Sequence, residues 1–373
     1  MHILFVCNPL HGHVNPMLPL ARAAQAAGHA VVVATGADIA PLAQRVGLET
    51  WSVGKTHAEA GGNKQASWLD YFEAGARMRI AHLGAPCAAW RPDLVIHEET
   101  ELAGPVVAAT LGVRSVVHGL GPMPPAQMLP WFAAAIERLA PPGSSTTVLD
   151  AWREAIYLHQ CPPGMSLGDD PQGPIWSHVL PLRPTLPNPV NEPALTSRIE
   201  QLPHTRSVFV TLGTVYDGNT AELAAAIDGL HGHAINLIVA VGPQADPSRF
   251  AGHGDHVLVE RLVPLASVLP RCDAVVSQGG SGVMLGAMAL GLPQLILPQG
   301  ADQFRNAGLA VGTGAALALM PSDASPQAIG VSVQRLMGEE RFGAAARDLR
   351  DQIGAMPDAG EVMSMLSGDH DPA

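Results

Sequence analysis

Short, continuous apolar runs alternate along the chain with Ala-rich stretches that begin near a proline and end at a glycine. Ile3 to Cys7 has the pattern of a strand buried on both faces of a parallel sheet. After a loop over Asn8 to Asn15, a helix is predicted over Pro16 to Ala27, with Gly28 as its stop signal. Val31 to Ala34 is the next strand, so the chain opens with a βαβ unit.

The same alternation continues to the end of the chain. Further strands are predicted at Leu94–Ile96, Ser115–Val117, Ser207–Leu212, Leu237–Val241, Ala274–Val276 and Leu295–Leu297, and helices at Ala103–Leu111, Ala221–Leu230 and Val283–Leu290. Alternating strands and helices predict an α/β fold with doubly wound parallel sheets.

A proline-rich segment divides this pattern into two halves. Residues 181–193 hold five prolines, which favour an extended connector. We therefore predict two Rossmann-like domains, residues 1–185 and 186–373, with a linker over about 181–205. Pro357 should break the last helical stretch, 338–366, and we expect the final helix to pack back on the N-terminal domain.

Composition narrows the function. The 373 residues carry a net charge of -12 and no basic patch, which argues against nucleic acid as a partner. The four cysteines are widely spaced, and the chain shows neither a signal peptide nor an apolar run long enough to span a membrane. These features predict a soluble cytoplasmic protein without a membrane partner. The oligomeric state stays open, with a homodimer as one alternative.

Two histidines follow the first predicted strand. His11 and His13 lie just past its carboxyl end, where open α/β sheets bind ligands. A histidine there can take a proton near neutral pH, so His13 is a candidate general base. A solvent-exposed or helix-capping histidine is an equally weighted alternative.

An acidic segment, His97 to Glu101, follows the strand Leu94–Ile96. A carboxylate there can orient a histidine and stabilise its protonated form. From the residues alone, the simpler alternative is preferred, since acidic residues also favour the start of a helix.

Small residues cluster before the predicted helix Val283–Leu290. The segment Ser277-Gln278-Gly279-Gly280-Ser281-Gly282 lets a phosphate approach backbone N–H groups at a helix start, which predicts a diphosphate ligand. Leu285 removes the GxGxxG motif of dehydrogenases, and Val283 removes the GxSxG motif of hydrolases. A tight turn without a ligand is the alternative.

Two more polar segments end strands of the second half. Asp302 and Gln303 can accept from and donate to sugar hydroxyl groups. Thr211, Gly213 and Thr214 can line the same site. A polar loop and a capping threonine are the respective alternatives.

Aromatic residues mark the first half of the chain. All six tryptophans lie between Trp51 and Trp176. Most will be core residues, but their distribution places a hydrophobic substrate in the first half. The candidates for contact with it are His11, Trp68, Met78, Met123 and Phe132. A DxD-like triplet, 369–371, is discounted as a metal site because it lies at the chain end, and no metal or other cofactor is predicted.

Six segments together resemble one known family. They are HGHVNPMLPLA from His11, RPDLVIHEETELA from Arg91, VVHGLGP from Val116, VTLGT from Val210, LVPLASVLPRCDAVVSQGGSG from Leu262 and GLPQLILPQGADQFRNA from Gly291. The chain resembles, nearly end to end, the GT-B fold, family 1 glycosyltransferases that decorate bacterial antibiotics such as enediynes and other polyketides.

The resemblance implies an inverting, metal-independent transfer of a sugar from a nucleoside diphosphate to a hydroxyl of a hydrophobic aglycone. A thymidine diphosphate deoxysugar is the expected donor, with uridine diphosphate as the alternative. His13 maps to the general base and Glu98 to its acid partner, where the family usually has Asp. The implied donor contacts are the glycine-rich loop (Gln278, Gly279, Gly280, Ser281, Gly282) for the diphosphate, Val263 for the base, and Asp302 with Gln303 for the sugar.

Two departures from the family pattern concern the donor. The family commonly has His-Gly-Gly-Ser-Gly-Thr in the loop, and here Gln278 and Val283 replace the His and the Thr. Two lost contacts would cost about 2–3 kcal/mol of donor binding. They motivate the alternative of a non-catalytic relic or auxiliary partner of another transferase. A sugar-nucleotide epimerase on the same fold is a further alternative.

Overall fold

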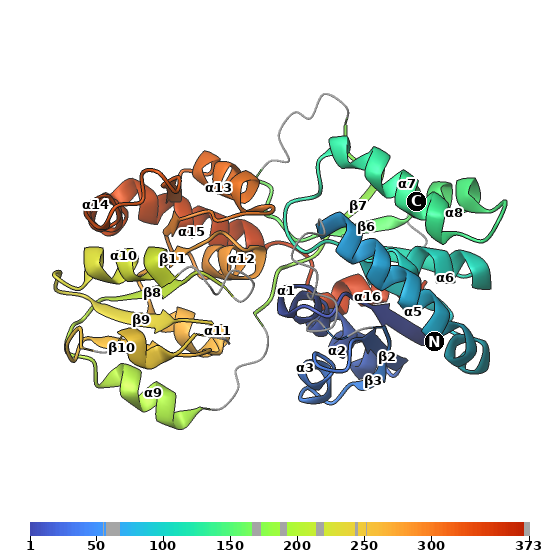
Figure 1. The fold of residues 1–373 in the computed structure, drawn as a ribbon, viewed down its shortest axis with the longest axis horizontal. Coiled ribbons are helices and arrows are strands. Elements are labelled where there is room, and N and C mark those ends of the chain that lie inside the picture. The colour runs from blue at the N-terminus through green and yellow to red at the C-terminus, as the bar shows by residue number, and fades with distance from the viewer. Residues whose placement is uncertain are drawn as a thin grey trace. The chain divides into compact units, whose positions relative to one another are not determined.

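The computed structural model describes residues 1–54, 56, 68–165, 173–186, 192–213, 220–242, 245–250 and 252–368. The chain divides into two compact units, and each is described by itself (Figure 1). Unit 1 comprises Met1–Gln160, Asp169–Arg183 and Pro357–Ala373, and unit 2 comprises Cys161–Gly168 and Pro184–Met356.

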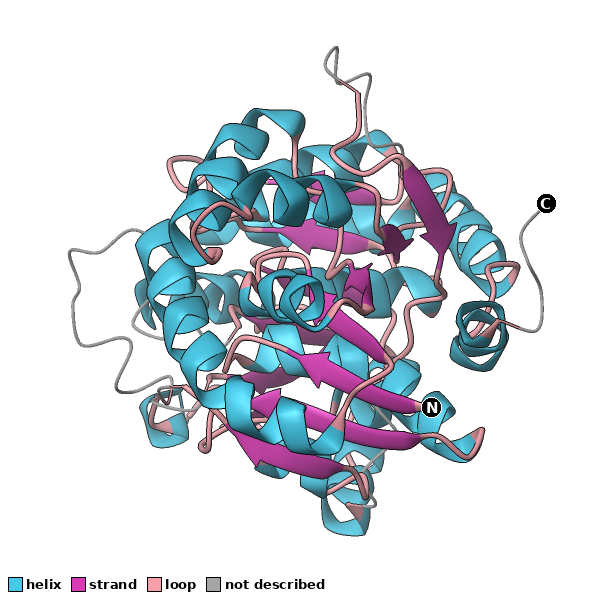
Figure 2. Cartoon of the chain, turned by 90° about the vertical axis from the view of Figure 1, so that its right-hand side faces the viewer, coloured by secondary structure: helices cyan, strands magenta, loops and turns pink. Residues whose placement is uncertain are grey.

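Unit 1 is built on a seven-stranded sheet of order β3-β2-β1-β4-β5-β6-β7, all of whose described pairs are parallel. Its strands are β1 (His2–Val6), β2 (Ala30–Thr35), β3 (Glu49–Ser52), β4 (Leu94–Glu98), β5 (Arg114–His118), β6 (Ile156–His159) and β7 (His178–Pro181). The central strands β1 and β4 are almost entirely buried because helices cover both faces, as Figure 2 shows.

The helices of unit 1 form two apolar cores, one on each face of this sheet. The described helices are α1 (His11–Val14), α2 (Leu18–Ala26), α3 (Pro41–Gln44), α5 (Trp68–Trp90), α6 (Ala103–Leu111), α7 (Leu129–Leu139), α8 (Ser145–Arg153) and α16 (Ala359–Ser367), with short 3₁₀ turns at Asn15–Met17 and Ala126–Met128. On one face, α2, α3 and α16 pack against Ile3, Phe5 and Ile96. On the other, α5 and α6 pack against Leu4 and Val95.

Unit 2 repeats the design with a six-stranded parallel sheet of order β10-β9-β8-β11-β12-β13. Its strands are β8 (Ser207–Thr211), β9 (Asn236–Ala240), β10 (Val257–Glu260), β11 (Ala274–Ser277), β12 (Gln294–Ile296) and β13 (Ala316–Ala318). Its helices are α9 (Pro193–Glu200), α10 (Thr220–Leu230), α11 (Leu265–Val268), α12 (Ser281–Ala289), α13 (Gln303–Gly312), α14 (Pro326–Gly338) and α15 (Glu340–Gly354), with 3₁₀ turns η3 (Pro247–Phe250) and η4 (Leu269–Arg271).

Two parallel-sheet α/β units agree with the predicted fold class. Helix α6 has the predicted bounds, and Gly112 ends it at φ +68°, a conformation that costs glycine little. The expected loop over Asn8 to Asn15 is different in the structure. His11–Val14 forms one helical turn, closed by bonds from the N–H groups of His13 and Val14 to Leu10 O. Gly12 and Pro16 suggested a loop, but neither interrupts these bonds. Gly12 can adopt the helical conformation of the turn, and Pro16, which lacks an N–H group, follows the turn and so removes none of its bonds.

The chain leaves unit 2 and returns to unit 1 at its end. Pro357 separates α15 from α16, and its carbonyl accepts a bond of 2.8 Å from Arg183 N. Helix α16 packs within unit 1, where Val362, Met363 and Leu366 join the core of α2. The chain first enters unit 2 with the short segment Cys161–Gly168, and it crosses again between Arg183 and Pro184, before the sheet of unit 2 begins. Among the described helices, none is long and apolar enough to cross a membrane.

Candidate active site

The carboxyl ends of β1 and β4 lie side by side in unit 1. The two strands are parallel neighbours, and Val6 pairs with His97. The segments that follow them, Asn8 to Val14 and Glu98 to Glu101, therefore start at the same edge of the sheet. This is the edge at which open α/β sheets bind ligands.

His13 and Glu98 are in direct contact at this edge. His13 Nδ1 lies 2.9 Å from Glu98 Oε1. The Glu98 side chain is fully buried, whereas 16% of the His13 side chain is exposed. An ionised carboxylate only accepts hydrogen bonds, so the proton of neutral His13 resides on Nδ1 and the Nε2 lone pair is left available.

Glu98 is held by hydrogen bonds from three residues. Besides His13, Asn8 Nδ2 donates to Oε1 at 2.5 Å, and the N–H and hydroxyl of Thr100 donate to Oε2 at 2.7 and 2.9 Å. Burial alone would raise the pKa of Glu98. The charge and hydrogen bond of His13 and the bonds from Thr100 outweigh it and lower the pKa to about 2. Glu98 is therefore ionised at neutral pH despite its burial.

Two residues of the acidic segment make the two kinds of contact that the sequence left open. Glu101 caps α6, because its carboxylate accepts from Ala103 N at 3.0 Å and Gly104 N at 2.7 Å. The same carboxylate pairs with Arg79 of α5, whose Nε lies 2.7 Å from Oε1. Glu101 thus supports the helix start, and Glu98 faces the histidine.

Aromatic residues of α5 lie on the other side of His13. The rings of His13 and Phe72 are 5.6 Å apart between centroids, and Trp68, which is 36% exposed, contacts Phe72 in turn. Met78 on the same helix is half-buried, as is His11. Phe72 thus links Trp68 to His13 through ring contacts.

The other two residues expected to contact the acceptor are interior. Met123 is 2% exposed. Phe132 has no exposed surface and packs among Trp131, Trp152 and Trp176. The geometry gives Phe132 a packing role, because a side chain enclosed by three tryptophans has no face left for a ligand.

In unit 2, the glycine-rich segment forms the sharp turn between β11 and α12. Gly279 has φ +86°, and a Cβ there would lie 2.7 Å from Ile296 Cγ2, so both the conformation and the space require glycine. Gly280 caps the helix without a side-chain bond. The first N–H groups of α12, from Ser281 and Gly282 onward, are thus available to an anion.

The two replaced family positions lie in different surroundings. Gln278 is 8% exposed, covers Gly213 so closely that a Cβ there would overlap its Nε2, and has an Oε1 without a hydrogen-bond partner among the described residues. Val283 is half-buried and packs, like Val263, against the apolar core of α9, α11 and α12. Val283 is therefore a packing residue here.

The expected sugar-binding pair is tied to its own loop. Gln303 is 6% exposed, and its Oε1 accepts from Gln299 N at 2.8 Å and Gly300 N at 3.1 Å. Asp302 is exposed, and its Oδ2 accepts from Asn306 Nδ2 at 2.8 Å. Any bond from Gln303 to a ligand must therefore come from its amide nitrogen.

Asn306 joins this loop to the glycine-rich turn, since its Nδ2 also donates to Gly279 O at 3.0 Å. The Thr211 hydroxyl ties the end of β8 to its surroundings without capping a helix, because it donates to Ala240 O at 3.1 Å and accepts from Gly213 N at 3.2 Å. Thr214 and the 369–371 triplet lie outside the described residues.

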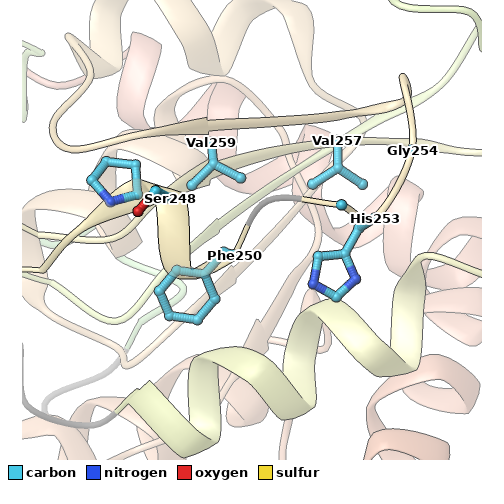
Figure 3. Close-up of a pocket in the computed structure, with 8 residues that line it drawn as sticks. Ser248, Phe250, His253, Gly254, Val257 and Val259 are labelled. Atoms are coloured by element: carbon cyan, nitrogen blue, oxygen red, sulfur yellow. The ribbon is translucent and has the colours of Figure 1, made fainter.

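A separate pocket of about 340 Å³ lies along β10 and is lined by Phe250, His253, Val257 and Val259 among others (Figure 3). In the part of the chain that the structure describes, one group of side chains has metal-ligand spacing: Asp228, His231 and His253. Asp228 and His231 lie at the end of α10, which leads into the start of β9. This group is therefore at the opposite edge of the sheet from the glycine-rich turn.

The structure adds functional neighbours that sequence reasoning missed: Asn8, Phe72, Arg79, Thr100 and Asn306. Asn8 had a usable signal, because it is a polar residue directly after a buried strand. Arg79 had none, since nothing local distinguishes it from Arg77 on the same helix.

Solved structures match this chain over nearly its whole length. The glycosyltransferase SnogD from Streptomyces nogalater superimposes with a TM-score of 0.79 at 26% identity, over 98% of each chain. The spinosyn rhamnosyltransferase SpnG, solved with thymidine diphosphate and with spinosyn aglycone, gives 0.81 at 25% identity, over 99% of this chain and 100% of SpnG. The chain is a glycosyltransferase with the GT-B fold.

Sequence comparison places it more narrowly. Residues 62–213 match the N-terminal domain, and residues 233–368 the C-terminal domain, of erythromycin biosynthesis protein CIII-like glycosyltransferases. L-demethylnoviosyl transferase of Streptomyces niveus is 30% identical over 99% of this chain and 98% of its own length. Elloramycin glycosyltransferase ElmGT of Streptomyces olivaceus is 31% identical over 98% and 97%. The chain belongs to the EryCIII-like family of antibiotic glycosyltransferases.

Proposed function

We propose that the protein transfers a deoxysugar from a thymidine diphosphate donor to a hydroxyl group of a hydrophobic aglycone, with inversion and without a metal ion. The observation that carries the proposal is the 2.9 Å contact between His13 and the buried, ionised Glu98. The donor class is supported by a relative named for deoxysugar transfer, aclacinomycin-T 2-deoxy-L-fucose transferase of Streptomyces galilaeus, and by SpnG, which was solved with thymidine diphosphate.

In this mechanism, His13 is the general base. The proton of the acceptor hydroxyl moves to Nε2, the acceptor oxygen bonds to the anomeric carbon, and the bond from that carbon to the diphosphate breaks. The bond's electron pair leaves with the diphosphate, and attack from the opposite face inverts the anomeric centre. Glu98 keeps the imidazole ring in place and balances the positive charge that forms on it.

The start of α12 stabilises the leaving group. The N–H groups of the segment Gly279 to Gly282 and the positive end of a nine-residue helix offset the charge that develops on the diphosphate. This is the work that a metal ion does in other transferases. The proposed transfer therefore needs no metal ion, because backbone N–H donors supply the positive potential.

The first test is transfer from dTDP-L-rhamnose to 7-hydroxy-4-methylcoumarin, followed as loss of coumarin fluorescence. We expect His13→Ala to lower the rate at least ~100-fold, while dTDP binding by calorimetry is unchanged. His178→Ala, at an exposed histidine, is the control and should behave as wild type. The proposal is wrong if His13→Ala retains near-normal turnover, or if EDTA abolishes transfer by the wild type.

The second test separates the two nucleotides. Calorimetric titration with dTDP and UDP, on the wild type and on Gln278→His with Val283→Thr, shows which base is preferred. Micromolar binding of dTDP by the wild type is the expected result. Binding only by the double variant would mean that the glycine-rich turn is disabled, which is the one outcome that favours the non-catalytic alternative. Donor consumption without acceptor would favour an epimerase.

A further inference from the structure

The buried side chains behind Glu98 form one connected chain of hydrogen bonds. Arg79 Nη2 donates to Asn8 Oδ1 at 2.5 Å, and Asn8 Nδ2 donates to Glu98 Oε1 at 2.5 Å. Glu101 holds the other side of the guanidinium, at 2.7 Å from Nε. We propose that Arg79 and Asn8 are positioning residues, which fix the orientation of Glu98 and thereby the tautomer of His13. This inference rests on the proposed role of His13 as the base.

The polarity of these groups permits one arrangement only. A guanidinium only donates, and an ionised carboxylate only accepts. The amide of Asn8 lies between them, so its oxygen must face Arg79 and its nitrogen must face Glu98. If Arg79 were absent, the Asn8 amide would be free to rotate and to present its oxygen to the carboxylate, which is repulsive.

Two glycines, Gly54 and Gly75, leave the space that the Arg79 side chain occupies. A Cβ on Gly75 would lie 3.1 Å from Arg79 Nη1, and a Cβ on Gly54 would lie 3.1 Å from Arg79 Cγ. Arg79 itself is 1% exposed. A buried ion pair is costly, and an apolar replacement is often as stable. Retaining a fully buried arginine here is thus explained better by orientation of the site than by stability.

The charges of the cluster fit the same task. Glu98 and Glu101 are negative and Arg79 is positive, so the buried cluster carries one net negative charge, and a protonated His13 completes it. Four further titratable side chains of unit 1 have pKa values that keep them neutral at pH 7. Burial raises the pKa values of the Cys7 thiol and of the Tyr71 hydroxyl, and it lowers those of His97 and His118, the last to about 4.

The tautomer of His13 is measured directly by ¹⁵N NMR of the full chain with labelled histidine at pH 8, where His13→Gln assigns the signals. In the wild type, we expect the Nδ1–H form alone, with widely separated Nδ1 and Nε2 signals. In Asn8→Ala, exchange between both tautomers should reduce that separation by half or more. A purely structural role of Asn8 would leave it unchanged.

Graded variants of the arginine test the next link. Arg79→Met should reduce the same separation, and Arg79→Lys should do so less, because lysine keeps the charge but cannot bond both partners in the guanidinium geometry. Gly75→Ala crowds the guanidinium, with a Cβ 3.1 Å from Nη1, without removing it, and keeps the inference testable if Arg79→Met does not fold. Arg77→Met, an exposed arginine on the same helix, is the matched control and should match the wild type.

Turnover with dTDP-L-rhamnose and 7-hydroxy-4-methylcoumarin completes the test. Asn8→Ala should lower kcat ~10-fold to 100-fold, and Gly75→Ala should lower it less, with the affinity for dTDP unchanged in both. An unchanged His13 tautomer in Asn8→Ala and Gly75→Ala would overturn the positioning role. Full activity of His13→Ala would instead overturn the proposed function, and it would leave the tautomer result standing, so the two failures are distinguishable.

Discussion

The carboxyl edges of the two sheets are equipped in opposite ways. In unit 1, the edge holds a cluster of charged side chains centred on the buried Glu98, drawn from α1, α5, β4 and the segment that follows β4. In unit 2, the corresponding edge is a turn of small residues with an uncharged Gln278, and its potential donors are backbone N–H groups. Removal of a proton requires a titratable side chain at one point, whereas an anion with several oxygens is matched by several backbone donors. Under the proposed function, the two edges of the same fold would serve two chemistries.

Among the variants that test this difference between the two edges, a change at Glu101 should have the largest effect on stability. Glu101→Gln leaves the buried Arg79 without its charged partner, and we expect a loss of about 3–5 kcal/mol in the free energy of unfolding. Thermal and urea unfolding of the full chain measure this loss. The control is Glu340→Gln, because Glu340 forms an exposed ion pair with Arg347, and a change below ~1 kcal/mol is expected there. Equal effects of the two variants would contradict the proposed importance of burial.

The next effect depends on pH. The pKa of Glu98 is lowered from 4.5 to about 2 in the folded protein, so folding favours its ionised form. This stabilisation is complete above pH 4.5 and is lost as the pH falls from 4.5 towards 2, and it amounts to about 3 kcal/mol. The free energy of unfolding is measured for the wild type and for Glu98→Gln between pH 2 and 7. Only the wild type should lose the stabilisation that comes from ionised Glu98 as the pH falls. Parallel pH curves for the two proteins would refute the assignment.

At the edge of unit 2, the backbone should be the sensitive element. Gly279→Ala places a Cβ 2.7 Å from Ile296 at φ +86°, and we expect about 1–3 kcal/mol of destabilisation together with weaker dTDP binding. Gly308→Ala is the control, because its Cβ would meet nothing within 4 Å. Calorimetry and thermal unfolding measure both. Unchanged dTDP affinity in Gly279→Ala would mean that the glycine-rich turn does not bind the donor.

The smallest effect concerns Ala301, in the loop before Asp302. Ala301 has φ +51°, a conformation that favours glycine. We expect Ala301→Gly to stabilise the protein by up to ~1 kcal/mol, and Ala344→Gly, on the exposed face of α15, to destabilise it by a similar amount. If the melting temperatures of the two variants shift in the same direction, the backbone conformation of Ala301 does not destabilise the loop.

The predictions that succeeded depend on local signals. A buried strand, an Ala-rich helix and a following glycine are each readable within about ten residues, which is why the bounds of α6 agreed with the expectation. The segment Asn8 to Asn15 shows the limit of such signals, since a single helical turn contains too few residues to outweigh Gly12 and Pro16.

The site illustrates what local patterns do not contain. His13 and Glu98 are 85 residues apart, and the resemblance paired them, whereas the acidic composition of 97–101 alone favoured a helix start. Arg79 and Asn8 are 71 residues apart and belong to no motif. Which of Arg77 and Arg79 is buried depends on how α5 packs against the sheet, and that orientation is a tertiary property.

The return of the chain to unit 1 at Pro357 has a consequence for protein engineering. A chimera that exchanges everything after Arg183 would also replace α16, and with it the contacts of Leu366 O with Arg114 and of Ser367 with His29 at 3.1 Å. The graft would then present a foreign helix to the native core around α2. Unit 2 of this chain is therefore better exchanged as an insertion over 184–356, together with the separate segment Cys161–Gly168, than as a tail.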